Sequence, residues 1–171
     1  TVRDEYGYEL YLEFFNKNGL ETVPFETFKS YSRVSEQTNT LAYINGCVPD
    51  ERKTDVKKFV KRITLDGYKT HKGVPIENIK KENRDINEPV AIGSPYFLYF
   101  IFRALAMDGD CESILKVTRR EYEFMLQCGT NTCWETFYNE GSDYWTRSIC
   151  HAWSGAPAVY LLTEICGIKP Q

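Results

Sequence analysis

The residue types best suited to chemistry are concentrated near the C-terminal end of the sequence. All three tryptophans fall within one short window, together with two cysteines and one of only two histidines. These residues are Trp134, Trp145, Trp153, Cys133, Cys150 and His151. Any site that this chain contributes is therefore predicted to lie in this window.

Glu135 is the strongest candidate for acid or base chemistry. It follows a predicted helix end at Gly129 and is flanked by Trp134 and Phe137. Aromatic neighbours would desolvate its carboxylate and raise the pKa toward values useful in acid or base catalysis. A surface glutamate beside aromatic residues is the simpler interpretation. A second string, residues 146–157, adds His151 at the start of the last predicted helix, where small residues let a ligand approach closely.

The cysteines are expected to be reduced and structural. A chain of 171 residues can form a core without disulfides, and several cysteines lie within apolar helical patterns, where a free thiol packs as a small hydrophobe. This usage favours a cytoplasmic location, although any signal peptide would precede Thr1. A metal site is conceivable from residue types alone, using Cys128, Cys133, Cys150 and His151. Their spacing matches no repeated zinc-ligand pattern, so neither a metal nor another cofactor is predicted.

Composition and charge limit the partners that are expected. The formal net charge is −3 and the basic residues are scattered, which argues against a nucleic-acid partner. The longest apolar run, residues 96–102, is far shorter than the ~18 residues that a membrane-spanning helix needs. With 42% hydrophobic and 26% charged residues, the chain is expected to be a soluble globular segment without a membrane partner.

Helix signals recur along most of the chain and predict helical hairpins. A helix begins after Ser35 and ends near Gly46, and a second runs from Asp50 to Gly67. Residues 96–107 are apolar on all sides, which predicts burial on more than one face. A break at residues 108–110 separates this helix from another that ends at Gly129.

The remaining segments are less regular. After Cys150, one apolar stripe fits a last helix that ends at Gly167, and its members are Ala152, Ala156, Val159, Leu162 and Cys166. Residues 4–15 fit a helix, followed by a turn at 16–19 and extended chain at 20–28. Residues 67–92 form a long polar connector with no helical period, either disordered or part of a site. Hairpins joined by long loops favour an all-α toroid or solenoid over a four-helix bundle.

Four sequence blocks together resemble a known family. The strings GTNTCWETF (129–137) and TRSICHAWSGAPAVYLLTEICGIKP (146–170) resemble the G-A-T-T-x-W-E-x-W and S-x-S-H-A-W-S-A-x-P patterns of bacterial α-L-rhamnosidases. Upstream, RVSEQTNTLA (33–42) resembles S-x-Q-x-N-A-L-A, and GSPYFL (93–98) resembles G-S/T-P-F/Y-F/L. The four blocks stand in the family's order. The chain is therefore similar to the C-terminal part of the six-hairpin catalytic domain of these enzymes and their close relatives.

The resemblance implies an (α/α)₆ toroid that hydrolyses a terminal α-L-rhamnoside with inversion. Glu135 matches the family's general base, and His151 matches a histidine that contacts the sugar. Apolar walls against the sugar would be formed by Trp134, Trp145 and Trp153. At least one of the three is nevertheless expected in the core, and Trp153 is the first candidate. Departures from the family pattern at residues 131, 137 and 150 leave the exact sugar open.

The resemblance also implies that part of the site lies outside this chain. The family's general acid comes from the first half of the toroid, and nothing before Ser35 matches it. Residues 1–171 are therefore expected to form one segment of about six helices, the second half of a toroid, with the N-terminal half as its partner and no activity alone. Alternatives are a six-hairpin glycosidase of other specificity, a non-catalytic carbohydrate-binding or interaction module, and a metal-dependent protein using the cysteines and His151.

Overall fold

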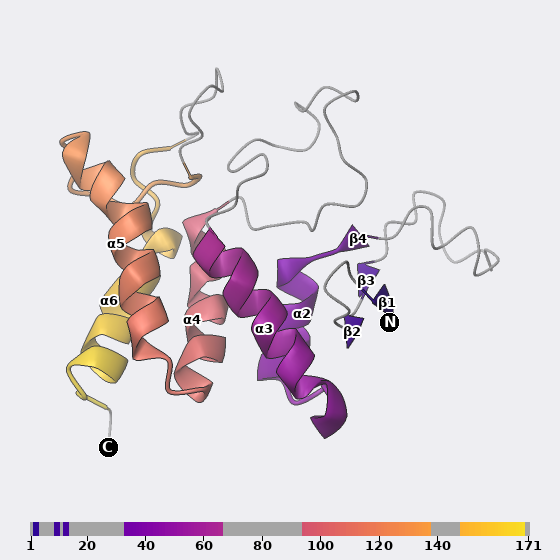
Figure 1. Ribbon diagram of the computed structural model, residues 1–171. Helices are drawn as coiled ribbons and strands as arrows, with labels where there is room; N and C mark the ends of the chain where they lie inside the picture. Colours follow the sequence, from indigo (N-terminus) through magenta and orange to yellow (C-terminus); the bar gives the residue numbers. More distant parts are fainter. Residues whose placement is uncertain are drawn as a thin grey trace, which may run out of the picture.

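The fold is a set of helical hairpins with short strands at its N-terminal side (Figure 1). The computed structural model describes residues 2–3, 9–10, 12–13, 33–66, 94–137 and 148–169. Strand β1 (Val2–Arg3) pairs antiparallel with β2 (Glu9–Leu10), and β3 (Leu12–Glu13) pairs antiparallel with β4 (Arg33–Val34). The helix predicted over residues 4–15 is therefore wrong at the four positions described there. These positions pair with Val2–Arg3 and Arg33–Val34, and such contacts between segments are not visible in a local helical period.

The first hairpin forms as its capping residues predict. Helix α2 (Glu36–Ile44) begins after Ser35, whose hydroxyl accepts a hydrogen bond from the Thr38 backbone N–H at 3.0 Å. Gly46 has a φ of +70°, the left-handed conformation that glycine adopts most readily after a helix. Helix α3 (Asp50–Asp66) then returns along α2.

The second hairpin is also confirmed. A 3₁₀ turn, η3 (Pro95–Phe97), leads into α4 (Leu98–Met107), and α5 (Cys111–Gln127) follows after a tight break. The Asp110 side chain caps α5 by accepting a hydrogen bond from the Ser113 N–H at 3.2 Å. Helix α4 packs against α2, α3, α5 and α6, so the expected burial on more than one face is confirmed.

The last segment differs from its prediction. It is broken into a 3₁₀ turn, η4 (Ala152–Ser154), a short helix, α6 (Ala156–Tyr160), and a π-helical turn, η5 (Leu161–Ile165). Of the predicted apolar stripe, Ala156 is buried, whereas Val159 is 46% and Leu162 is 52% exposed. The π turn carries more residues per turn than an α-helix. Residues that would share one face of a regular helix therefore point in different directions here. Ala156 and Tyr160 make the core contacts instead.

The helices form two layers (Figure 1). Helices α2, α4 and α6 lie side by side at the back, and α3 and α5 cross in front of them. The three back helices begin at the same end of the array, the upper end in this view. Between the layers lies a core that includes Phe59, Leu98, Phe102 and Ile114. The all-α prediction is confirmed, and alternation between two layers is the arrangement expected for part of a hairpin toroid.

Two further features of the helices follow from their composition. Helix α3 buries one apolar face, which includes Val56, Phe59 and Val60. None of the helices described is long and apolar enough to cross a bilayer.

A polar cluster joins the hairpins near the end of α3. The Arg120 guanidinium on α5 donates to the carbonyl oxygens of Leu65 and Thr64 at 2.8 and 2.7 Å and to the buried Glu121 carboxylate at 2.6 Å. The Thr64 hydroxyl donates to the buried carboxylate of Glu36 at 2.7 Å. The cluster gives polar partners to the last carbonyls of α3 and to two buried acids, which would otherwise destabilise the fold.

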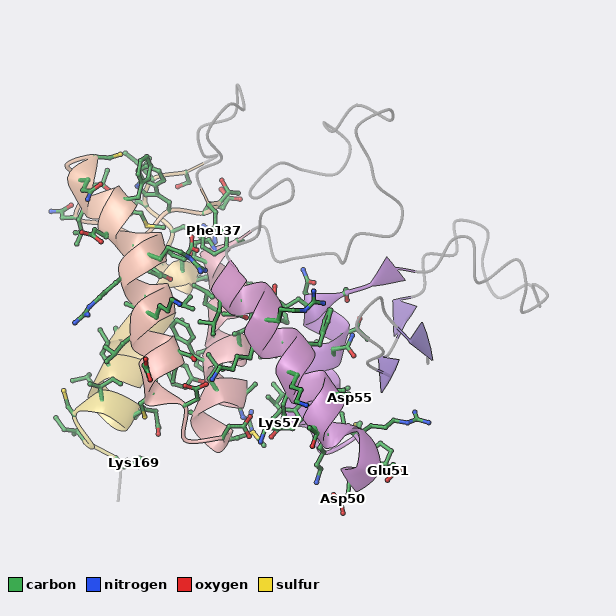
Figure 2. The ribbon with its side chains drawn as sticks, viewed as in Figure 1. Asp50, Glu51, Asp55, Lys57, Phe137 and Lys169 are labelled. Atoms are coloured by element: carbon green, nitrogen blue, oxygen red, sulfur yellow. The ribbon has the colours of Figure 1, made fainter. Side chains whose placement is uncertain are left out.

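Ion pairs join the hairpins at the opposite end. Lys57 on α3 contacts Asp108 at 2.7 Å, and Lys61 contacts Asp110 at 2.5 Å. The Tyr43 hydroxyl also donates to Asp108 at 2.6 Å. These side chains line a cavity of about 490 Å³. Figure 2 shows Lys57 at the lower end of the array and Phe137 at the upper end, so this cavity lies away from the residues considered below.

Replacement of Asp110 tests how much these ion pairs between the hairpins stabilise the fold. We expect Asp110→Ala to lower the free energy of unfolding by about 1–2 kcal/mol, because it removes an N-cap and a partly exposed ion pair. Burial opposes ionisation of Asp110, but hydrogen bonds from Lys61 and Ser113 outweigh it and lower the pKa. The contribution of the carboxylate is therefore complete above the unfolded-state pKa of about 3.9 and is lost as the pH falls below it. Urea unfolding at pH 7 and at pH 3 measures both effects, and equal losses at the two pH values would contradict this explanation.

Candidate active site

The two strings around Glu135 and His151 lie against each other. The backbone N–H of Glu135 donates to the Ser148 carbonyl at 2.9 Å, and the N–H of His151 donates to the Cys133 carbonyl at 2.8 Å. The Thr132 hydroxyl also donates to the Ile149 carbonyl. Because residue numbers rise on one side as they fall on the other, the strings run antiparallel. The structure therefore places the strings that carry Glu135 and His151 side by side.

A third segment is attached to the same place. The Ser94 hydroxyl donates to the Glu135 carbonyl oxygen at 2.5 Å and accepts a hydrogen bond from the Tyr96 backbone N–H at 3.3 Å. One side chain thus caps the start of the α4 segment and fixes the backbone that carries Glu135. Three of the four sequence blocks therefore meet at this point.

The aromatic neighbours of Glu135 are core residues. Trp134 is fully buried, packs edge-to-face on Phe124 with ring centroids 5.7 Å apart, and donates from Nε1 to the Thr130 hydroxyl at 3.0 Å. Phe137 is also buried, whereas Glu135 itself is half-buried. The two rings anchor the string on either side of Glu135, which leaves the glutamate in the partly exposed position between them.

The predicted roles of the tryptophans need two corrections. Trp134, expected to contact a sugar, has no exposed surface and is a core residue. Trp153, expected in the core, is 71% exposed. The reason is that Trp153 lies in the 3₁₀ turn η4, before α6 begins, and the interrupted helix does not direct it inward. Trp145 lies outside the described residues.

His151 lies at the start of the last helical segment. His151 is half-buried, and its ring centroid is 6.3 Å from that of Trp153. Tyr122 on α5 holds the following turn, because its hydroxyl donates to the Ser154 carbonyl at 2.6 Å. Burial raises the pKa of Tyr122 well above its usual range, and Cys133 and Glu121 raise it further. The phenol therefore remains a neutral donor at physiological pH.

The cysteines are free thiols, but they are not packed as expected. None of the six is buried, and Cys47, Cys128, Cys150 and Cys166 are exposed. Burial raises the pKa of the Cys133 thiol, and the nearby Cys150 raises it further. Among the residues that the structure describes, no three His, Cys, Asp or Glu side chains come together as a metal site.

Comparison with known proteins agrees with the fold and the sequence blocks. Residues 8–165 match the bacterial alpha-L-rhamnosidase six-hairpin glycosidase domain. A similar solved structure is the crystal structure at 1.9 Å of a GH78 family rhamnosidase from Bacillus sp. GL1, with a TM-score of 0.54 and 31% sequence identity. The similarity covers 77% of this chain and 12% of that one. No functionally curated sequence matches significantly.

The chain belongs to the bacterial alpha-L-rhamnosidase six-hairpin glycosidase domain family. Its fold is accordingly part of a six-hairpin glycosidase fold, and the two-layer arrangement of α2–α6 is consistent with that assignment.

Two residues of the site were not singled out from the sequence. Both belong to the GSPYFL block (93–98), but the sequence predicts a role in the site for neither. The bond from Ser94 to Glu135 joins residues 41 positions apart. No local pattern indicates such a contact, since it depends on how the hairpins pack.

Proposed function

We propose that this chain contributes to an inverting glycoside hydrolase that acts on terminal α-L-rhamnosides. The observation that carries the proposal is the backbone pairing of the strings that hold Glu135 and His151, with Ser94 attached to the same point. Family membership and the similarity to a GH78 rhamnosidase support the substrate class.

Glu135 is proposed as the general base. In an inverting hydrolase, one carboxylate deprotonates the water that attacks the anomeric carbon, while a second carboxyl group protonates the leaving oxygen across a gap of roughly 6.5–9.5 Å. A half-buried carboxylate on a fixed backbone suits the first role, since it can reach a substrate and still be shielded when one binds. The general acid is proposed to come from outside this chain.

His151 and Trp153 are proposed to contact the substrate, and Trp145 remains a predicted contact. The imidazole of His151 can hydrogen-bond a sugar hydroxyl, and the exposed indole of Trp153 offers an apolar surface.

We also propose that the active protein contains further toroid helices. Val159 and Leu162 on the last helical segment, and Ile168 shortly after it, expose large apolar side chains. In a toroid such surfaces are covered by neighbouring hairpins, which would also supply the general acid.

A panel of aryl glycosides tests the proposed function. The complete gene product that contains this chain should release aglycone from an aryl α-L-rhamnoside with a higher kcat/KM than from the matched α-L-fucoside, β-D-glucoside or α-D-mannoside. Proton NMR during turnover should show β-L-rhamnose as the first product, because inversion converts the α-linkage to the β-anomer. Preference for another glycoside would reject the substrate, and α-L-rhamnose as the first product would reject inversion. Sugar binding without turnover of any substrate would favour a binding module.

Ser94 is expected to act as a positioning residue. Ser94→Ala removes the donor to the Glu135 carbonyl, and we expect about a tenfold fall in kcat with little change in KM, since small displacements of a reacting group are costly. Ser94→Thr keeps a hydroxyl and should recover most of the rate. Steady-state kinetics on the aryl rhamnoside measure both variants. An equal loss in the two variants would show that the hydroxyl is not what positions Glu135.

A further inference from the structure

Two aromatic rings from different parts of the chain form an exposed pair beside the candidate site. The ring centroids of Tyr96 and Trp153 are 5.7 Å apart at an interplanar angle of 44°. Tyr96 is 39% exposed and Trp153 is 71% exposed. We refer to these two side chains as the aromatic shelf. Large exposed aromatic side chains that gather in one place are a feature of binding surfaces.

The shelf is held by the same contacts that hold Glu135 and His151. The backbone N–H of Tyr96 donates to the Ser94 hydroxyl, which in turn donates to the Glu135 carbonyl. Trp153 lies two residues after His151, whose N–H donates to the Cys133 carbonyl. These hydrogen bonds therefore connect the segments that carry the shelf to the segment that carries the proposed base.

The chemistry of the shelf suits a sugar ring. An aromatic face offers apolar surface and negative potential, which attract the C–H groups on one face of a pyranose. The Trp153 ring is next to both the His151 and the Tyr96 rings, with centroid separations of 6.3 and 5.7 Å. If His151 contacts the terminal sugar, Trp153 beside it and Tyr96 packed on Trp153 are placed for the group attached to that sugar.

We propose that the aromatic shelf binds the second sugar of a rhamnosyl oligosaccharide, the residue that carries the terminal rhamnose. This inference rests on the proposed function for the identity of the terminal sugar. Tyr96 is thereby assigned as a substrate contact. His151 would contact the terminal sugar, and the aromatic shelf would contact the second sugar.

Two substrates with similar leaving groups test the shelf. Methyl α-L-rhamnoside has no second ring, whereas α-L-rhamnosyl-(1→6)-D-glucose has one. In the complete gene product, Trp153→Ala and Tyr96→Ala should each lower the ratio of kcat/KM for the disaccharide to that for the methyl glycoside by about tenfold, the size expected for loss of one aromatic contact. The rate of L-rhamnose release measures hydrolysis of both substrates.

Matched variants separate ring stacking from general damage. Tyr96→Phe keeps the ring and should keep the ratio. Tyr99→Ala removes a nearby exposed aromatic residue, on α4, whose ring packs on Phe100 and Tyr160 and not on Trp153. It should also keep the ratio.

Three results would overturn the proposal. An unchanged ratio in Trp153→Ala and Tyr96→Ala would show that the shelf contacts no second sugar. Equal losses on both substrates would place the shelf against the terminal sugar. If the wild-type protein hydrolyses neither substrate, the proposed function fails, and calorimetric titration with the disaccharide then tests the shelf separately. Weaker binding by about tenfold in Trp153→Ala would support the shelf, and unchanged binding would reject it.

Discussion

Glu135→Gln in the complete gene product should lower kcat for an aryl α-L-rhamnoside by about 10²–10⁴-fold, the usual contribution of a general base. Glutamine has nearly the same shape as glutamate, but its amide cannot accept the proton of the attacking water. The backbone bonds that hold residue 135 do not involve the side chain, so the variant should fold normally. Initial rates together with a circular dichroism spectrum measure the two parts of this expectation.

A control and a rescue experiment make the test specific to base catalysis. Glu123→Gln changes an exposed carboxylate on α5 and should leave the rate unchanged. Azide needs no deprotonation, so it should restore turnover in Glu135→Gly and give β-L-rhamnosyl azide. Near-normal turnover in Glu135→Gln, or the absence of an azide product with inverted configuration, would reject the assigned role.

Trp134→Ala should lower the free energy of unfolding by about 3–5 kcal/mol, as large-to-small replacements in a core do. The indole is fully buried against Phe124. Its removal leaves a cavity next to the string that carries Glu135. Trp134→Phe retains a ring and loses chiefly the hydrogen bond to the Thr130 hydroxyl, so its cost should be nearer 1 kcal/mol. Urea denaturation of the complete gene product measures both.

The matched control for this prediction is a second tryptophan in the same window. Trp153→Ala removes an equally large side chain from an exposed position, and its cost in stability should be below about 1 kcal/mol. Similar destabilisation by Trp134→Ala and Trp153→Ala would contradict the difference in burial between the two side chains. The pair also separates effects on stability from effects on substrate binding, because Trp153 belongs to the aromatic shelf and Trp134 belongs to the core.

Local sequence signals predicted most of the helical elements. Ser35 and Asp110 accept hydrogen bonds at the starts of α2 and α5, and Gly46 and Gly129 adopt the left-handed conformation after α2 and α5. Such signals act over a few residues, so they can be identified without the rest of the fold. The order of the four sequence blocks likewise indicated the family, which the domain match confirms.

The sequence by itself therefore determined helices α2 to α5, their hairpin order and the window that holds Glu135 and His151. The tertiary structure alone decided that Trp134 is buried and Trp153 is exposed, and it showed that Ser94 bonds to the Glu135 carbonyl and that Tyr96 packs on Trp153. The physical reason is the distance along the sequence over which each kind of interaction acts. Caps and turns depend on neighbours within one helical turn, whereas burial of Trp134 and the bond from Ser94 to Glu135 depend on the packing of hairpins distant in the sequence.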